Sequence, residues 1–293
     1  MRIDSHHHLW DLSAVSYPWL EARGERRFFG DPAPIQRNYE LPEFRQDAER
    51  AGIQASVHIQ VGAADPLAEA RWVQSVADAF PDWPIKQVVF CDLTSPDLEE
   101  KLETFQSLST VAGVRQIVGR APGEDAATGT NELLDNPAFV EGLRAVAARN
   151  LSFDLQLLPE LMGAAARTFA QVPNLKVALC HAGSPHDRSA EGIAAYAQAL
   201  KGLSSLPNMV CKISGLGMFD HHWNAKTVAP IFEACLAQFG PERLLFGSNF
   251  PVDSLSSTYD ELIARHRALV SAVPLSGQAL FWGDAAALFY GFA

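Results

Sequence analysis

Apolar runs of strand length recur eight times along this chain of 293 residues and alternate with stretches of helical spacing. The runs are nearly continuous in apolar residues, which is typical of parallel strands covered on both faces. Eight such strands alternating with helices predict an α/β fold, a (β/α)8 TIM barrel, and the chain length suits it. The predicted strands are Arg2–His8, Ala55–Val61, Ile85–Leu93, Gly113–Gly119, Leu151–Leu158, Lys176–Gly183, Met209–Leu216 and Leu244–Val252.

The stretches between these runs have the periodicity of amphipathic helices. A doubly wound sheet is the alternative, but no Gly-x-Gly-x-x-Gly turn follows the first strand. No linker or repeat interrupts the pattern, so we expect a single domain over residues 1–293. The connection Leu12–Asn38 is long and rich in Pro, Gly, Arg and aromatic residues, and we expect it to form a lid or pocket wall. The clearest predicted helices are Pro66–Phe80, Asn136–Arg149, Glu191–Leu203, Thr227–Phe239 and Ser257–Val270.

The composition limits the partners of this chain. Its formal net charge of −11 disfavours nucleic acid and anionic membranes, which attract basic surfaces, but allows a locally basic site for an anionic small molecule. The four cysteines are far apart in sequence, which predicts no disulfide and a reducing compartment. The start of the chain lacks the apolar core of a signal peptide and no run reaches the length of a membrane span, so we expect a cytoplasmic protein. A small-molecule substrate is the expected partner, and the sequence leaves the oligomeric state open.

Eight of the nine histidines lie at the carboxyl ends of predicted strands or in the loops that follow. In a barrel these ends open onto one face, which is where barrel enzymes build their active sites. Histidine binds metals and exchanges protons near neutral pH, so this distribution indicates an enzyme. The eight histidines are His6, His7, His8, His58, His181, His186, His221 and His222.

His6 and His8 are expected to project from the same face of the first strand, because alternate residues of a strand share a face. His7 should point the other way. Two imidazoles on one side can hold one metal ion or polarise one carbonyl group. His181 ends the sixth predicted strand, and Gly183 just after it lets a ligand or another backbone come close.

Four motifs resemble the amidohydrolase superfamily, of the amidohydrolase 2 type. The resemblance is to the branch that contains sugar-lactone lactonases and 2-pyrone-4,6-dicarboxylate lactonase. It implies a (β/α)8 barrel that hydrolyses a cyclic ester or a related bond. The motifs are Asp-x-His-x-His-x-Trp at 4–10, His-x-Gly-x-Pro at 181–185, Gly-Ser-Asn-Phe-Pro-Val at 247–252 and Phe-Trp-Gly-Asp-Ala-Ala at 281–286.

The chain departs from this superfamily at the eighth strand, where Asn249 stands in place of the usual aspartate. An amide is no general base, although it can position water or a carbonyl group. Asp253 is the nearest carboxylate that could replace the base, or it could be the N-cap of the following helix. The fourth strand also lacks the lysine of binuclear members. The donor set therefore predicts either no metal or one weakly bound divalent ion, preferably zinc, held by His6, His8 and His181.

Other polar or aromatic residues near the predicted strand ends are candidates for substrate binding. The guanidinium of Arg115 suits a carboxylate, and Lys212 would bring a positive charge toward the histidines. Paired polar residues inside apolar strands could instead satisfy one another in a buried layer. The full set of these candidates is Trp10 as a pocket wall, His58, Gln60, Arg115, Lys212 and His221.

The leading hypothesis is a hydrolase that opens a small, anionic lactone. The catalytic residues would be His6, His8, His181, Asn249 and Asp253, with the histidines polarising the carbonyl and Asp253 or a histidine activating water. Two alternatives remain at this point. One is a metal-dependent decarboxylase of the same superfamily, and the other is an inactive barrel that only binds a metabolite.

Overall fold

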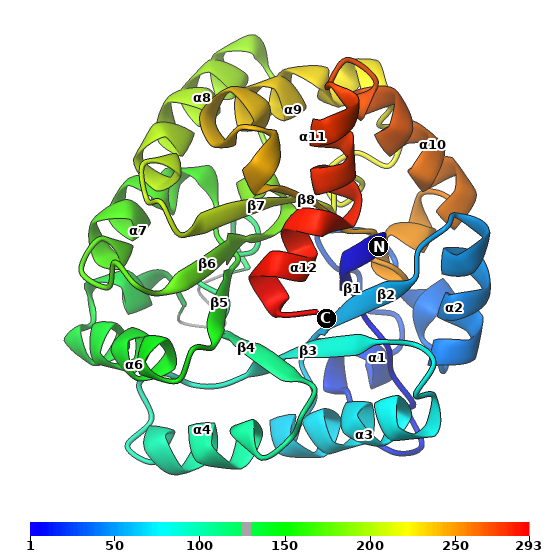
Figure 1. Ribbon diagram of the computed structural model, residues 1–293, viewed down its shortest axis with the longest axis vertical. Helices are drawn as coiled ribbons and strands as arrows, with labels where there is room; N and C mark the ends of the chain where they lie inside the picture. The colour runs from blue at the N-terminus through cyan, green and yellow to red at the C-terminus, as the bar shows by residue number, and fades with distance from the viewer. Residues whose placement is uncertain (125–129, 293) are drawn as a thin grey trace.

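The computed structural model describes residues 1–124 and 130–292 and contains an eight-stranded parallel sheet surrounded by helices (Figure 1). The strands follow one another around the sheet in chain order, as predicted for a (β/α)8 barrel. They are β1 (Ile3–His7), β2 (Ala55–Ile59), β3 (Ile85–Phe90), β4 (Val111–Arg115), β5 (Ser152–Leu155), β6 (Lys176–Leu179), β7 (Met209–Ile213) and β8 (Leu244–Phe246).

The strands end earlier than the apolar runs predicted. His181 and Asn249, expected in strands, lie in the loops after β6 and β8, where their φ angles are +56° and +58°. A left-handed backbone cannot continue a β ladder, so each strand ends before these residues. The polar side chains that follow the strands are thereby released from the sheet and can turn toward one cavity.

The seam between β1 and β8 is closed by the segments that carry the site. The His8 N–H donates to the Phe250 carbonyl and the Asn249 N–H donates to the His6 carbonyl, both over 2.7 Å. The buried carboxylate of Asp4 accepts further hydrogen bonds from the loop after β8. The barrel closure and the geometry of the site therefore depend on the same contacts.

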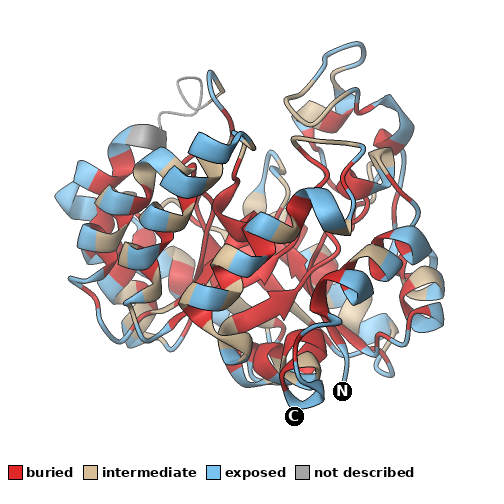
Figure 2. Ribbon diagram, turned by 90° about the horizontal axis from the view of Figure 1, so that it is seen from above, coloured by how far each residue is buried: buried red, intermediate tan, exposed pale blue. Residues whose placement is uncertain are grey.

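Helices cover the outside of the barrel and present exposed outer faces, while the strands are buried (Figure 2). Asp65 and Asn136 cap their helices, each just before a proline. The helices are α1 (Pro18–Glu21), α2 (Leu41–Arg50), α3 (Pro66–Ala79), α4 (Leu98–Gln106), α6 (Pro137–Ala148), α7 (Met162–Phe169), α8 (Ala190–Ser204), α9 (Ala225–Phe239), α10 (Tyr259–Val270), α11 (Leu275–Ala279) and α12 (Ala285–Tyr290). Within the described ranges, no helix is long and apolar enough to cross a bilayer.

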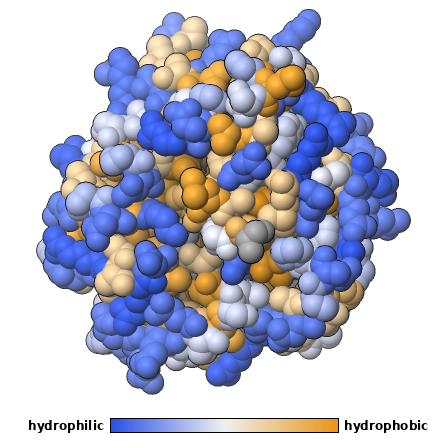
Figure 3. Space-filling view, in the orientation of Figure 1, coloured by the Kyte–Doolittle hydropathy of each residue, from blue (hydrophilic) through white to orange (hydrophobic). Residues whose placement is uncertain are grey.

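The C-terminal helix α12 covers the end of the barrel opposite to the site (Figure 1). Its Phe289 and Tyr290 pack with apolar residues of the barrel interior, among them Ile3 and Val210. Figure 3 shows this face, with hydrophilic side chains around the periphery and hydrophobic ones gathered nearer the centre. The interior is therefore sealed at this end, and ligands must enter from the other. The four cysteines are all buried and free, in agreement with the sequence.

Candidate active site

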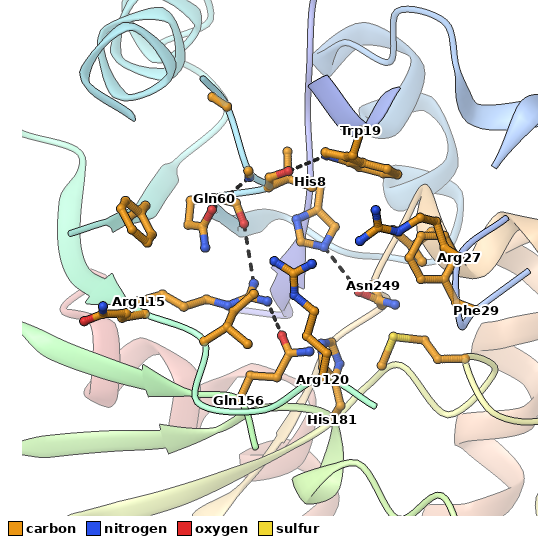
Figure 4. A pocket seen from close by; sticks show the side chains of 18 of the residues that line it. His8, Trp19, Arg27, Phe29, Gln60, Arg115, Arg120, Gln156, His181 and Asn249 are labelled. Atoms are coloured by element: carbon orange, nitrogen blue, oxygen red, sulfur yellow. Dashed lines mark hydrogen bonds between the residues drawn. The ribbon is translucent and has the colours of Figure 1, made fainter. Parts of the chain in front are cut away.

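A cavity of about 650 Å³ lies at the carboxyl ends of the strands. The loop between β1 and α2 forms part of its wall, as the composition of that loop predicted (Figure 4). Most of the remaining lining comes from the segments that follow the strands. The lining includes His8, Trp19, Arg27, Phe28, Phe29, Gln60, Phe90, Arg115, Gln116, Arg120, Gln156, His181, Met218 and Asn249.

His181 reaches this cavity from a left-handed turn. The φ angles of His181, Ala182 and Ser184 are +56°, +51° and +53°, a conformation that costs non-glycine residues of the order of 1 kcal/mol or more each. The His181 Nδ1 lies 3.1 Å from the Ser214 hydroxyl, which leaves Nε2 as the ring nitrogen that can serve the cavity. A Cβ atom at Gly215 would lie only 2.4 Å from His181 Nδ1, so this glycine makes room for the imidazole.

A chain of hydrogen bonds links His8, Asn249 and Asp253. The His8 Nδ1 donates to the Ile59 carbonyl over 2.7 Å, and the His8 Nε2 lies 3.2 Å from the Asn249 amide. That amide lies 2.9 Å from the Asp253 carboxyl group. Asn249 is therefore held from both sides while its side chain lines the cavity (Figure 4).

The protonation states of His8 and Asp253 in these hydrogen bonds follow from their burial. Desolvation lowers the pKa of His8 to about 3, so its ring is neutral and Nε2 accepts. Burial raises the pKa of Asp253 to about 7 despite hydrogen bonds that oppose the change. An Asn249 orientation that donates N–H to His8 and accepts from a protonated Asp253 fits both pKa shifts. With the Asn249 oxygen toward His8 Nε2 and the amide N–H donating to Asp253, both nitrogens of His8 would have to donate, which requires an imidazolium.

Asp253 lies behind Asn249 and is not among the described residues that line the cavity. The prediction that it contacts the reacting water directly is therefore not supported by its position. Its alternative role as a helix N-cap is wrong, because Thr258 caps α10 in a capping box with Glu261. Asp253 can act only through the amide of Asn249.

His6 lies beneath the two histidines of the cavity. Its ring centroid is 4.4 Å from that of His181 and 5.2 Å from that of His8. Neither ring nitrogen of His6 has a hydrogen-bond partner among the described residues. Desolvation, followed by the nearby positive charges, lowers the pKa of His6 well below its usual value. As the strand alternation predicted, His7 points away and stacks on Phe44 at 3.9 Å.

The three histidines do not fit a resident metal ion. Over residues 1–124 and 130–292, no group of three or more His, Cys, Asp or Glu side chains is arranged to hold one. Both nitrogens of His8 have other neighbours, and no carboxylate of the described residues completes a ligand group with His6 and His181. The predicted ligand set of His6, His8 and His181 is thus not assembled in the part of the chain that the structure describes.

Arg115 supplies a buried positive charge to the cavity wall. Its guanidinium donates to the Gln60 carbonyl and to the Gln156 side chain, whereas its Nε has no partner in the described residues. Desolvation lowers the pKa of Arg115, but a guanidinium stays charged at neutral pH. Arg27 and Arg120 also line the cavity, although no sequence motif pointed to either of them. The arginine-rich composition of the loop that carries Arg27 is the sequence feature that could have indicated its role.

Lys212 does not line the cavity, so the prediction that it binds substrate is corrected. Its ammonium group is fully buried inside the barrel, 2.5 Å from the Asp154 carboxylate and 2.8 Å from the Ser5 carbonyl. The Tyr290 hydroxyl of α12 donates to the same carboxylate. The polar residues of this layer satisfy one another, which is the alternative that the sequence left open.

His58 faces the helices and not the cavity. Its Nδ1 accepts the Leu9 N–H over 3.1 Å, and its Nε2 lies 3.6 Å from the Glu69 carboxylate of α3. Gln60 does line the cavity, because β2 ends at Ile59 and the alternation of its side chains stops there. Of these two predicted substrate-binding residues, only Gln60 therefore reaches the cavity.

Two further candidates support the wall from behind. Trp10 is fully buried, packs edge-to-face on Trp19 at 5.8 Å, and donates its indole N–H to a backbone carbonyl. The His221 Nε2 donates to the Phe29 carbonyl over 2.6 Å. Trp19 and Phe29, not Trp10 and His221, form the surface of the cavity.

The barrel and the histidine-rich cavity at its carboxyl face define a (β/α)8-barrel enzyme. The chain belongs to the amidohydrolase family, whose sequence profile matches residues 3–292. It is accordingly a hydrolase of the amidohydrolase superfamily, as its motifs indicated.

Full-length relatives agree with this assignment. An uncharacterised protein of Sinorhizobium fredii is 33% identical over 98% of this chain and 97% of its own length. An L-fucono-1,5-lactonase of Burkholderia multivorans is 28% identical over 99% of this chain and 96% of its own. A crystal structure of a B. multivorans amidohydrolase with bound HEPES covers both chains completely, with a TM-score of 0.85 and 25% identity. Another crystal form of that amidohydrolase, at 24% identity, contains zinc.

Proposed function

We propose that this protein hydrolyses a small anionic lactone in the cavity at the carboxyl ends of its strands. The observation that carries the proposal is the pairing of a neutral His181, with its Nε2 free to serve the cavity, and the buried guanidinium of Arg115 in the same wall. This pairing suits an anionic ester, because Arg115 can attract the negative group while His181 takes a proton from the attacking water. The similarity to an L-fucono-1,5-lactonase supports ester-ring opening as the reaction.

Arg115 is the residue that holds the negative group of the substrate. Arg115 lines the cavity, and the charge of its guanidinium favours a carboxylate. Arg27 and Arg120 add to the positive potential of the cavity, although the chain as a whole carries a net charge of −11. The related B. multivorans amidohydrolase binds HEPES, which bears a sulfonate group.

His181 is the general base of the proposed reaction. Burial, followed by the charge of Arg115, lowers the pKa of His181 well below its usual value, so the ring is unprotonated at neutral pH. As water attacks the carbonyl carbon, His181 Nε2 takes its proton. The bond from the acyl carbon to the ring oxygen then breaks, and the proton passes to the departing alkoxide. The product is a hydroxy acid, and His181 returns to its starting state.

Asn249 stabilises the oxyanion that develops on the carbonyl oxygen. One N–H of its amide is used within the chain of hydrogen bonds from His8 to Asp253, and the second is available to the cavity that Asn249 lines. His8 and Asp253 hold this amide in place, so they act as positioning residues. His6 packs beneath His181 and fixes the position of its ring.

The test is proton release from a panel of sugar lactones and aromatic ring-cleavage lactones, measured with and without a chelator. Hydrolysis of an anionic lactone that persists with chelator is the expected result. Carbon dioxide release from aromatic acids, without any lactone hydrolysis, would replace this proposal with decarboxylation. Tight binding of a ring-opened acid without turnover of any lactone would leave only a binding protein.

A further inference from the structure

One side of the cavity is an aromatic wall, defined here as Trp19, Phe28 and Phe29. All three are partly exposed, and all line the cavity. The ring centroids of Trp19 and Phe29 are 6.0 Å apart and those of Phe28 and Phe29 are 5.2 Å apart, in edge-to-face contact. Exposed apolar surface inside a cavity favours an apolar ligand.

The aromatic wall is fixed in place without a ligand. The Trp19 indole N–H donates to the Val61 carbonyl over 2.6 Å, and His221 holds the Phe29 carbonyl at the same distance. Phe28 packs on Phe219 with a centroid distance of 5.4 Å. Such fixation lowers the entropic cost of binding, which indicates a surface prepared for a ligand group.

The same cavity offers few acceptors for hydroxyl groups. The side-chain oxygens of Gln60, Gln116 and Gln156 already accept hydrogen bonds from the protein. None of the described lining residues is an aspartate or a glutamate. A polyhydroxylated ring would leave many hydroxyl donors unpaired here, and unpaired buried polar groups weaken binding strongly.

The volume of the cavity points the same way. At about 650 Å³ it lies in the middle of the range of roughly 300–1,000 Å³ that is typical of pockets for drug-sized ligands. A single unsubstituted lactone ring held by Arg115 would leave the aromatic wall against water. An apolar substituent on the ring removes that surface from water, at about 25 cal/mol per Å².

We propose that the substrate is an anionic lactone that carries an apolar substituent of phenyl size, seated against Trp19, Phe28 and Phe29. It is not a polyhydroxylated sugar lactone. This inference rests on the proposed hydrolysis and adds the chemical class of the group next to the reacting ring. The carboxylate contacts Arg115, the carbonyl lies between His181 and Asn249, and the substituent faces the loop after β1.

The experiment compares three lactones: paraconic acid, phenylparaconic acid and L-fucono-1,5-lactone. We expect kcat/KM to be at least about 10-fold higher for phenylparaconic acid than for either of the others. Phe29→Ala should lower the value for phenylparaconic acid about 10-fold and change that for paraconic acid less than about two-fold. Leu288→Ala, at an exposed position on α12, is the matched control and should change neither. Preference for the sugar lactone, or an equal loss on both paraconic acids, would overturn the inference.

Calorimetric binding of the ring-opened acids separates this inference from the proposed hydrolysis. The phenyl-substituted hydroxy acid should bind at least about 10-fold more tightly than the unsubstituted one, and Phe29→Ala should abolish the difference. Tighter binding of the phenyl acid without turnover of any lactone would support the ligand class and contradict the hydrolysis. Equal binding of the two acids, with paraconic acid hydrolysed, would contradict the ligand class alone.

Discussion

The cavity and the barrel interior beneath it both contain charged side chains, but their hydrogen bonding differs. In the interior, Lys212, Asp154 and Tyr290 satisfy one another and are fully enclosed. At the cavity, the Arg115 side chain is part of the lining, and the His181 Nε2 has no hydrogen-bond partner among the described side chains. A buried charge with complete partners supports the fold, whereas a polar group left open toward a cavity is available to a ligand. Substitutions in the two layers should therefore affect different quantities.

The largest effect is expected for His181→Asn, which removes the proposed base. We expect kcat/KM to fall by about 10²–10⁴-fold, the usual contribution of a general base, with little change in unfolding temperature. His186→Ala is the matched control, because His186 is a partly exposed histidine paired with the surface residue Glu160 at 2.8 Å. Kinetics and thermal unfolding of both variants test this. Near-normal turnover in His181→Asn would remove His181 from the mechanism.

The second effect is expected on stability, for Lys212→Met. Loss of the ammonium group leaves the Asp154 carboxylate buried without its partner, which costs about 3–5 kcal/mol in the free energy of unfolding. Denaturant titration measures this, and adding Asp154→Asn should recover part of the loss. If Lys212→Met instead kept full stability and raised KM, Lys212 would belong to the cavity and the contrast between the layers would fail.

A smaller effect is expected for Arg115→Gln. The variant keeps a polar side chain but loses the charge, and charge-assisted hydrogen bonds contribute about 1.5–3 kcal/mol. We expect kcat/KM for an anionic lactone to fall roughly 10–100-fold, mainly through KM, which steady-state kinetics measures. The methyl ester of the same lactone should lose much less. Equal losses on acid and ester would mean that Arg115 does not recognise the negative group.

The fourth effect concerns Asp253 and the pH dependence of stability. Burial raises the pKa of Asp253 from 3.8 to about 7, so the folded protein binds this proton more tightly than the unfolded chain. The resulting stability is complete below about pH 4 and is lost as the pH rises through about 7. Asp253→Asn should remove this loss. Between about pH 4 and 7, the free energy of unfolding of the variant should therefore fall less steeply with pH, by about 1 kcal/mol per pH unit. An unchanged slope would show that Asp253 is ionised throughout.

The sequence predicted the barrel because near-continuous apolar runs leave few other arrangements. It placed the strand ends too late, because the apolar runs extend past polar residues such as Gln60 and Asn249. At these residues the backbone has already left the sheet. It also did not single out the helices α2 and α7, whose positions depend on packing against neighbours.

Site residues were predictable where alternation along a strand decides the direction of a side chain, as for His6 and His8. Alternation did not predict that Gln60 lines the cavity while His58 faces the helices, because β2 ends between these two residues. Residue type alone could not show that Lys212 would find Asp154 across the barrel, 58 positions away. Arg27 escaped prediction because its place in the cavity wall depends on how a long loop folds.

The seam between β1 and β8 has a consequence for how activity arises as the chain is made. His8 and Asn249 are separated by 241 positions, and their contact requires the last strand to reach the first. Contacts of such long range form late, because closing the intervening loop costs entropy. A growing chain on the ribosome can therefore hold six or seven strands in place and still lack the proposed oxyanion site. Turnover would first appear when the eighth strand emerges and docks, so catalysis itself can serve as the signal that the barrel has closed.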